Sequence, residues 1–276
     1  MQETRSQAGF ASLHVGHVHG ASAVLGCRSR TPVSLLTPRA RGASVWAYSS
    51  SFGGGMVAGV SVTVDIQIDR SAVCFLGSQA SNKVYRNPHG LPCSHSLRAN
   101  IGADALLVLA PDPVQCFTDS NYEQRQIFQL ATSANLVLVD WFTAGRMARG
   151  ERWCFRRYYS RNAVVRDEKK ILIDAIALSN DSLPLTNRFR SGRFNCIATA
   201  ILIGPALQSF ATELLATIAR DPISPQGEVL SSASPLNEGA ILRIAGPSIE
   251  AVGHALSRFL QFVPQLLKDD PWVRKW

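Results

Sequence analysis

The sequence predicts a mainly β protein: a single β-rich domain of many short strands, solenoid- or sandwich-like, with two packed helices in the C-terminal third. Three observations support this class. Residues 60–69 alternate apolar and polar side chains, short β-prone runs recur up to residue 203, and helical periodicity appears only afterwards. The chain has 276 residues, of which 46% are hydrophobic and 17% charged, and this composition excludes a disordered or coiled-coil protein. We expect a flexible tail at residues 1–12 and one domain over residues 13–276.

The clearest strand signal lies at residues 60–69, where Val and Ile at even positions alternate with polar residues at odd positions. A strand with this pattern buries one face. Residues 53–55 and Gly59 precede it and predict a tight turn or bulge, because glycine adopts left-handed conformations at little cost. No fixed-length repeat is visible, so the sequence does not demonstrate a regular solenoid. The further expected strands are residues 72–76, 83–86, 96–101, 105–110, 126–131, 136–141, 153–159, 171–178 and 196–203.

Two later segments have the periodicity of helices. Residues 207–218 place apolar side chains at i, i+3, i+4 and i+7 spacing. Residues 249–263 do the same, with Pro247 at the expected start and Pro264 at the expected end. We expect both apolar faces to pack against the strands rather than to bind a partner.

Cysteine spacing and the N-terminal segment bear on the compartment. The six cysteines contain no C-x-x-C pair and predict reduced thiols, most of them small core residues. No apolar run is long enough to span a membrane. Residues 1–26 lack the design of a secretory signal, and the Arg- and Ser-bearing stretch up to Ala43, although compatible with a transit peptide, also predicts strands. We therefore expect a cytoplasmic protein.

Positive charge is concentrated in one stretch of the chain. Lys and Arg number 28 against 20 Asp and Glu, a net charge of +8, and residues 146–170 hold nine basic and three acidic side chains. Such a field favours an acidic partner, although a solvated Arg-rich rim explains it equally well. No RNP-type, KH or helix-turn-helix pattern is present, so we expect no nucleic-acid binding. The arginines predicted to contact a partner are Arg146, Arg149, Arg152, Arg156 and Arg157.

Signatures of catalysis are missing from the sequence, which has no G-x-S-x-G, P-loop, H-E-x-x-H or dinucleotide fingerprint. Asp140 ends the run at residues 136–139, which predicts a buried strand, and a carboxylate there needs a partner, water or a metal. An ion pair with Arg146, Arg149 or Arg152 is the simpler interpretation. A catalytic pair would need a second buried acid at a defined separation, which the sequence does not reveal.

Three histidines near the N-terminus, His14, His17 and His19, form an H-x-x-H-x-H cluster. Imidazole is a good ligand for nickel, zinc and copper. A straight strand would point His17 and His19 to one face and His14 to the other, so it would not assemble a three-histidine site. Solvated histidines are therefore favoured over a metal site.

Five segments together form an ordered set of motifs. They are residues 31–38 (TPVSLLTP), 52–59 (FGGGMVAG), 79–86 (QASNKVYR), 111–117 (PDPVQCF), and Asp140-Trp141 followed by residues 145–151 (GRMARGE). This set resembles the urease accessory protein family UreD, also called UreH, in its early strand, glycine-rich turn, QASTKVYR-like segment, P-x-P-x-x-x-F turn and D…GR-x-x-GE stretch. The resemblance covers about residues 13–276, is firmest over residues 31–178, and argues against a transit peptide.

The resemblance implies a largely β protein with two helices and no catalytic activity of its own. It implies a maturation scaffold that, with UreF and UreG partners, helps deliver nickel into apo-urease, and whose interior passage is thought to conduct the ion. On this basis we expect Asp140 and Glu151 to offer transient oxygen contacts to nickel along an internal channel. No cofactor is expected to bind tightly, since nickel is the transferred cargo.

The chain departs from the family pattern at Val60, where the family's glycine turn normally ends in aspartate. The family's threonines before and within the QASTK segment appear here as Gly77, Ser78 and Asn82. If the missing carboxylate lines the nickel route, this chain conducts poorly or uses another acid. The departure defines an alternative: a diverged UreD-like binding module that docks partners without conducting nickel. A hydrolase on a β scaffold is a third and much weaker alternative.

Overall fold

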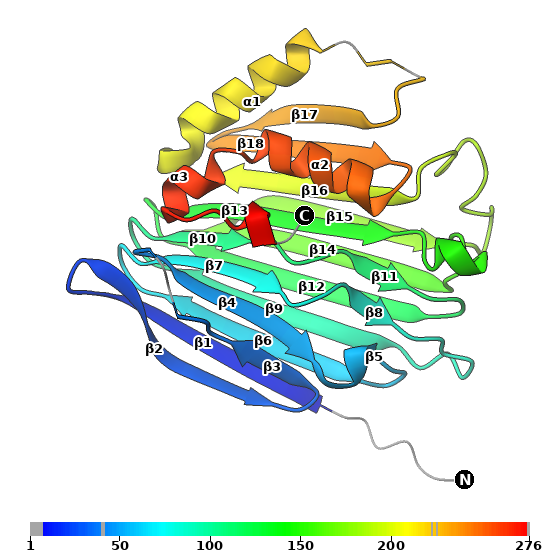
Figure 1. Cartoon of the computed structure of the whole chain (residues 1–276), viewed down its shortest axis with the longest axis horizontal. Helices are drawn as coiled ribbons and strands as arrows, with labels where there is room; N and C mark the ends of the chain where they lie inside the picture. The colour runs from blue at the N-terminus through cyan, green and yellow to red at the C-terminus, as the bar shows by residue number, and fades with distance from the viewer. Residues whose placement is uncertain (1–7, 40–41, 222, 225, 275–276) are drawn as a thin grey trace.

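The computed structural model describes residues 8–39, 42–221, 223–224 and 226–274, and its chain coils between two stacked β-sheets (Figure 1). The coil consists of eight strands. Successive strands lie in alternate sheets, and each strand pairs in parallel with the next strand of its own sheet. In chain order they are β4 (Val45–Ser51), β6 (Ser61–Ile68), β7 (Val73–Ser78), β9 (Cys93–Ile101), β10 (Leu106–Leu109), β12 (Asn121–Leu130), β13 (Asn135–Thr143) and β14 (Arg157–Arg166).

The coils differ in length. Ser61 pairs with Ser94, Ser94 with Glu123, and Asn121 with Arg157. The number of residues per coil therefore changes from one coil to the next, which explains why the sequence shows no fixed repeat.

Additional strands extend both sheets at their edges. The first sheet, which contains β6, β9, β12 and β14, also includes β1 (Ala8–Val18), β2 (Ala21–Arg30) and β15 (Lys169–Ser179). The second sheet, which contains β4, β7, β10 and β13, also includes β3 (Val33–Leu36), β16 (Cys196–Ile203), β17 (Leu230–Leu236) and β18 (Gly239–Gly246). The short strands β5 (Gly55–Met56), β8 (Asn82–Val84) and β11 (Val114–Cys116) pair with one another.

One end of the coil carries the connections from the second sheet to the first. We call it the loop end, and it consists of residues 52–60, 79–92, 110–120 and 144–156. It includes β5, β8 and β11, at the right of Figure 1, and the 3₁₀ turns η1 (Phe52–Gly54) and η2 (Met147–Arg149). Gly53, Gly54 and Gly59 have φ of 80°, 74° and 76°, so this turn needs the left-handed conformations that glycine allows.

Strand β13 lies between two hydrophobic cores and is buried along its whole length. Its side chains alternate, as they do in any strand. Leu136, Leu138 and Phe142 face the core between the sheets, whereas Val137 and Trp141 face a second core on the outer side of the second sheet. By the same alternation, Asp140 points to the space between the sheets.

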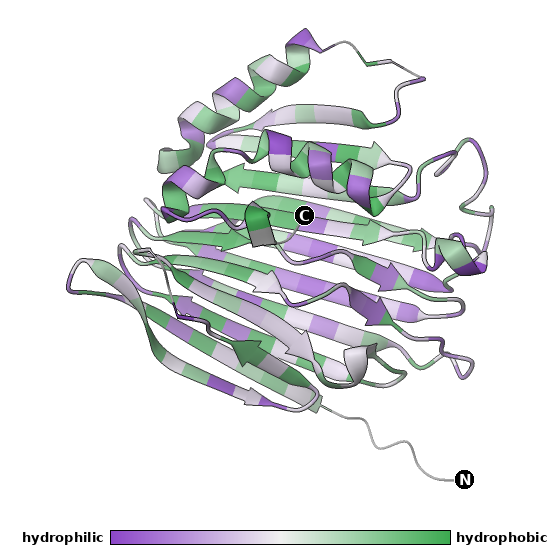
Figure 2. Ribbon diagram, viewed as in Figure 1, coloured by the Kyte–Doolittle hydropathy of each residue, from purple (hydrophilic) through white to green (hydrophobic). Residues whose placement is uncertain are grey.

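Helices cover the outer side of the second sheet. They are η3 (Pro205–Leu207), α1 (Gln208–Arg220), α2 (Ile249–Phe259) and α3 (Val263–Leu267), followed by η4 (Trp272–Arg274). Their apolar side chains complete the outer core, and Figure 2 shows α2 with mixed hydrophilic and hydrophobic bands above a mainly hydrophobic β16. Ser248 caps α2 by accepting a hydrogen bond from the Ala251 amide at 3.2 Å. No helix in the described part of the chain is long and apolar enough to cross a membrane.

The predicted fold class is confirmed, while several boundaries differ. Strand β1 begins at Ala8, inside the range where we expected a tail, and residues 1–7 lie outside the described chain. The strand expected at residues 153–159 begins only at Arg157, because Trp153 and Phe155 are buried in the core from a loop. Pro264 does not end α2; it lies in the first turn of α3, where proline loses no hydrogen bond.

Most of the cysteines are small core residues, as the sequence predicts. All six are free, and four of them, Cys74, Cys93, Cys116 and Cys196, are buried as small core residues. Burial raises the pKa of Cys93 and of Cys74 to about 12, so both thiols remain protonated and unreactive near neutral pH.

Candidate functional site

A cavity of about 270 Å³ lies between the two sheets near the loop end. We call it the inter-sheet cavity. Aliphatic side chains from both sheets form much of its wall, and Val62, Leu76 and Leu109 are among them. The volume exceeds several-fold the roughly 30 Å³ that one water molecule occupies in the liquid. The cavity therefore has room for a small ion with a shell of water. Its polar lining residues include Ser78, His95, Asp112, Gln124, Gln126 and Asp140.

The inter-sheet cavity adjoins a second, more open hollow on the surface. Both are lined by Ser78, Gln79 and Asp112, and the second hollow is also lined by Tyr48. The Ser78 hydroxyl donates to Asp112 Oδ2 at 2.8 Å and accepts from the Asp112 amide at 2.6 Å. This arrangement places one carboxylate, Asp112, where the two hollows meet.

Asp140 lies on the inner face of β13 and is held by three donors from the facing sheet. Gln124 Nε2 donates to Oδ1 at 3.0 Å, and the Ser160 hydroxyl and Asn162 Nδ2 donate to Oδ2 at 2.6 and 2.8 Å. The donors come from β12 and β14, so Asp140 links the two sheets across the core. All three donors are neutral, and none of these bonds cancels the charge of the carboxylate.

Burial dominates the electrostatics of Asp140. Desolvation raises the pKa of its carboxyl group, the three hydrogen bonds oppose that rise, and the charge of Asp174 adds to it. Asp174 itself is held in an ion pair with Arg243 at 2.5 Å. Among the described residues no cation is bonded to the Asp140 carboxyl group. Burial disfavours its ionised form, and a positive ion in the cavity would stabilise that form.

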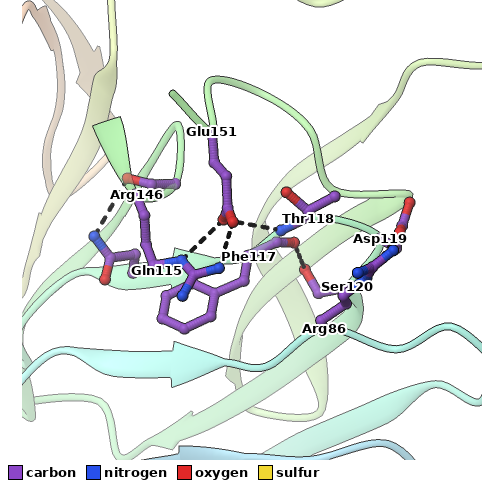
Figure 3. Close-up of polar contacts among 9 residues, drawn as sticks. Arg86, Gln115, Phe117, Thr118, Asp119, Ser120, Arg146 and Glu151 are labelled. Atoms are coloured by element: carbon purple, nitrogen blue, oxygen red, sulfur yellow. Dashed lines mark hydrogen bonds and ion pairs between the residues drawn. The ribbon is translucent and has the colours of Figure 1, made fainter. Parts of the chain in front are cut away.

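Glu151 occupies a different environment at the loop end (Figure 3). Its Oε2 accepts from Arg146 Nε at 3.0 Å and from the Thr118 amide at 3.3 Å, and its Oε1 pairs with the other end of the same guanidinium. The Arg146 guanidinium also lies 4.1 Å from the centre of the Phe117 ring. Glu151 is absent from the described lining of the inter-sheet cavity. The structure therefore does not bring Glu151 and Asp140 together in one hollow.

The other predicted partner-binding arginines divide into two groups. Arg152 is half-buried, and its Nε donates to Asn195 Oδ1 at 2.6 Å, so it connects the loop end to the chain that precedes β16. Arg149, Arg156 and Arg157 are exposed. Arg149 and Arg156 are available to an acidic surface, and Arg157 already pairs with Glu123 Oε2 at 3.5 Å. Arg146 and Arg152 hold the loop end together.

Val60 lies in the core rather than on the inter-sheet cavity. It is 4% exposed and belongs to the hydrophobic core between the sheets. It is not found in the described lining of the cavity, and its carbonyl accepts from the Ser94 amide at 3.0 Å. Its apolar side chain therefore fits the place that it occupies.

The N-terminal histidines do not form one site. His14 pairs through Nε2 with Asp69 Oδ2 at 2.8 Å, while His17 and His19 are exposed. The expectation that His17 and His19 share a strand face is wrong, because β1 ends at Val18 and His19 has a φ of 49° in the following turn. Across the described residues, no three His, Cys, Asp or Glu side chains are grouped so that they could hold a metal ion.

Most of the polar residues around Asp140 were not predicted from the sequence. Strand β12 contains a pattern from which two of them could have been predicted. Its even-numbered residues face the core, and two of these, between Tyr122 and Phe128, are glutamines where apolar residues are expected. A polar residue at a buried position needs a partner inside the protein. The missed residues are His95, Gln124, Gln126, Ser160 and Asn162.

Comparison with known proteins gives a consistent result over nearly the whole chain. Residues 7–276 match the family model described as UreD urease accessory protein. A urease accessory protein UreD from Sorangium cellulosum is 42% identical, with 98% of this chain and 85% of the relative covered. One from Anaeromyxobacter sp. is 39% identical, with coverage of 99% and 91%, and urease accessory protein D from Arabidopsis thaliana is 33% identical, with coverage of 94% and 98%.

Proposed function

The chain belongs to the UreD family of urease accessory proteins, and we propose that it helps deliver nickel into apo-urease as a cytoplasmic scaffold with no catalytic activity of its own. Its proposed partners are apo-urease and accessory proteins of the UreF and UreG types. Nickel is the cargo in this proposal, and no tightly bound cofactor is required.

One observation carries the proposal: Asp140 has a buried carboxyl group that lines a cavity, and its donors in the described part of the chain are all neutral. A divalent cation in that cavity gains the attraction of the anion without having to displace a resident Arg or Lys. A single carboxylate with water molecules binds an ion weakly, because strong cation sites use several charged ligands. Weak binding suits delivery, since a cage with many ligands would retain the ion.

The shared lining of the two hollows suggests a direction of travel. We propose that nickel enters through the open hollow, passes Asp112 and Ser78, and then reaches Asp140. Both carboxylates attract a cation, and both are fixed by hydrogen bonds, so neither must reorganise when the ion arrives.

Glu151 has a different proposed part in this route. Its carboxylate is neutralised by Arg146, so a contact with nickel requires that ion pair to open. We propose that Glu151 acts at the loop end after such an opening, and that Arg149, Arg156 and Arg157 dock the acidic face of a partner there.

The test is urease activation in a reconstituted system containing apo-urease, the accessory partners and nickel. Asp140→Asn keeps the size of the side chain but removes its charge, and we expect it to lower the activated urease at least tenfold while co-purification with the partners stays normal. Asp104→Asn is the matched control, because Asp104 is exposed and far from the loop end in the coil, with a φ of 59° that asparagine also adopts. Full activation by Asp140→Asn would refute this route.

Val60 supports the second candidate, a diverged module that docks partners without conducting nickel. The family resemblance implies an aspartate at this position, and the valine found here fits an apolar core. Under this alternative the chain co-purifies with urease and its accessory partners, yet Asp140→Asn and the unmodified chain give equally low activation.

A further inference from the structure

His95 is the one imidazole that lines the inter-sheet cavity in the described structure. It lies on β9 directly beside Gln124 of β12, and neighbouring strands are about 4.8 Å apart. Gln124 in turn donates to Asp140 Oδ1 at 3.0 Å. Gln126 is two residues further along β12 and faces the same cavity. An imidazole, an amide and a carboxylate are therefore gathered around one small volume.

Two of these groups have unused hydrogen-bonding capacity. His95 Nδ1 and Gln126 Oε1 are both buried and have no hydrogen-bond partner among the described residues. Buried polar atoms without a partner are rare in folded proteins and call for an explanation such as a bound water or ion. Because both residues line a cavity with room for water, a ligand held in the cavity provides that explanation.

We propose that His95, Gln126 and Asp140 form a weak binding site for a divalent cation, and that His95 makes this site prefer nickel-type ions over magnesium and calcium. The inference rests on the proposed function for its assignment of nickel as the cargo, whereas the donor set is read from the structure. Imidazole nitrogen suits nickel, while magnesium and calcium prefer oxygen donors. Three protein donors leave other positions to water, which keeps the ion exchangeable.

The protonation state of His95 agrees with this role. Burial lowers the pKa of the His95 imidazole to about 4, so the ring is neutral near pH 7 and keeps a lone pair for a metal. Cys93, two residues earlier on β9, is absent from the described lining of the cavity, so its thiol does not belong to the donor set. The site therefore has one nitrogen donor, one anionic oxygen donor and one neutral oxygen donor.

The experiment measures Ni²⁺ and Mg²⁺ binding to the full chain by isothermal titration calorimetry at pH 7. All proteins carry His17→Gln and His19→Gln, which remove two exposed histidines at the end of β1. We expect His95→Gln to raise the dissociation constant for Ni²⁺ at least tenfold and to leave the Mg²⁺ titration unchanged. His89→Gln is the matched control, because His89 is exposed in a turn outside the cavity, and it should bind both ions normally.

Unchanged Ni²⁺ binding by a folded His95→Gln chain would overturn the inference, and so would an equal loss of Ni²⁺ and Mg²⁺ binding. If this variant does not fold, the imidazole NMR signals of the parent chain decide. The His95 signal must shift or broaden on addition of Ni²⁺ and not of Mg²⁺, and an unmoved signal overturns the site.

The outcome is separable from that of the proposed function. Weakened Ni²⁺ binding by His95→Gln combined with full urease activation by Asp140→Asn would retain the cation site and reject the delivery route. Normal Ni²⁺ binding by His95→Gln combined with lost activation by Asp140→Asn would retain the route and reject His95 as its selective ligand.

Discussion

Asp140 and Glu151 are carboxylates eleven positions apart in one segment, yet their surroundings are opposite. Asp140 lies on a strand between two sheets, is bonded only to neutral donors, and has a pKa raised by burial. Glu151 lies in a loop, is bonded at both oxygens to Arg146, and has a pKa lowered mainly by that bond. The first carboxyl group faces the cavity with no cation bonded to it among the described residues, and the second has its charge neutralised by Arg146.

The comparison shows that position along the chain does not decide what a carboxylate does. Around Asp140 the fold buries a carboxyl group to which no cation is bonded among the described residues. Structural stability alone does not require this, because replacing buried charges by apolar groups is often neutral or stabilising. Around Glu151 the ion pair joins the segment after β13 to the segment after β11 through Thr118. The cavity therefore contains a carboxyl group that a cation can approach, whereas the ion pair at the loop end holds two segments together.

The largest effect on stability is expected when a third carboxyl group is introduced at a buried position that has neither the neutral donors of Asp140 nor the arginine of Glu151. Val60→Asp puts a carboxyl group at a position that is 4% exposed and belongs to the hydrophobic core between the sheets. We expect a loss of about 3 kcal/mol or more in the free energy of unfolding, since an unpaired buried charge is among the most destabilising changes. Urea denaturation followed by circular dichroism measures it.

Val57→Asp is the matched control for this change. Val57 lies three residues earlier in the same turn and is 50% exposed, so its replacement should alter the free energy of unfolding by less than about 0.5 kcal/mol. Equal stability of the two variants would show that a carboxylate at position 60 reaches water or a cation. A simultaneous gain in urease activation by Val60→Asp would then favour a lapsed nickel route.

A smaller effect is expected from the loop end. Glu151→Gln removes the charge from a bidentate pair whose glutamate side chain is 17% exposed, and we expect a loss of about 1 kcal/mol in unfolding free energy. Glu123→Gln breaks more exposed pairs with Arg125 and Arg157 and should cost less. A variant Glu151→Gln that is fully stable but defective in urease activation would contradict a purely structural ion pair and favour direct contact with nickel.

The fold was largely predictable because strand and helix periods are local properties. The alternation at residues 60–69 matches β6, and the two apolar helical stripes match α1 and α2. Strands β17 and β18 were not predicted: β17 contains Pro235 and several serines, and only its pairing with β18 defines it as a strand. Local pattern also could not show that Trp153 and Phe155 enter the core from a loop.

The site was predictable only in part. Asp140 stands out because it interrupts a buried apolar run, and that signal is contained in one strand. Its partners Gln124, Ser160 and Asn162 come from two other strands, and their convergence depends on how the coils are stacked. Glu151 shares a motif with Arg146, but sequence does not reveal that the two bind each other rather than a common ion.

The smallest expected effect is a difference in pH dependence between the two carboxylates. The pKa of Asp140 is raised in the folded protein above its ordinary value of 3.8, so the folded state holds that proton more tightly than the unfolded state. The resulting stabilisation is present below pH 3.8 and is lost as the pH rises through the raised pKa. The pKa of Glu151 is lowered below 4.5, so its stabilisation is present above pH 4.5 and is lost as the pH falls through the lowered pKa.

Unfolding free energies of the parent chain and two variants, measured between pH 4 and pH 7, expose these opposite signs. Relative to the parent, Asp140→Asn should gain stability as the pH rises, because the parent must then bury a charge that the variant lacks. Glu151→Gln should lose stability relative to the parent over the same rise, because the ion pair forms only in the parent. If the unfolding free energies of the two variants changed with pH in the same direction, Asp140 would be as well neutralised as Glu151. The cavity would then not offer a cation the negative charge that we propose.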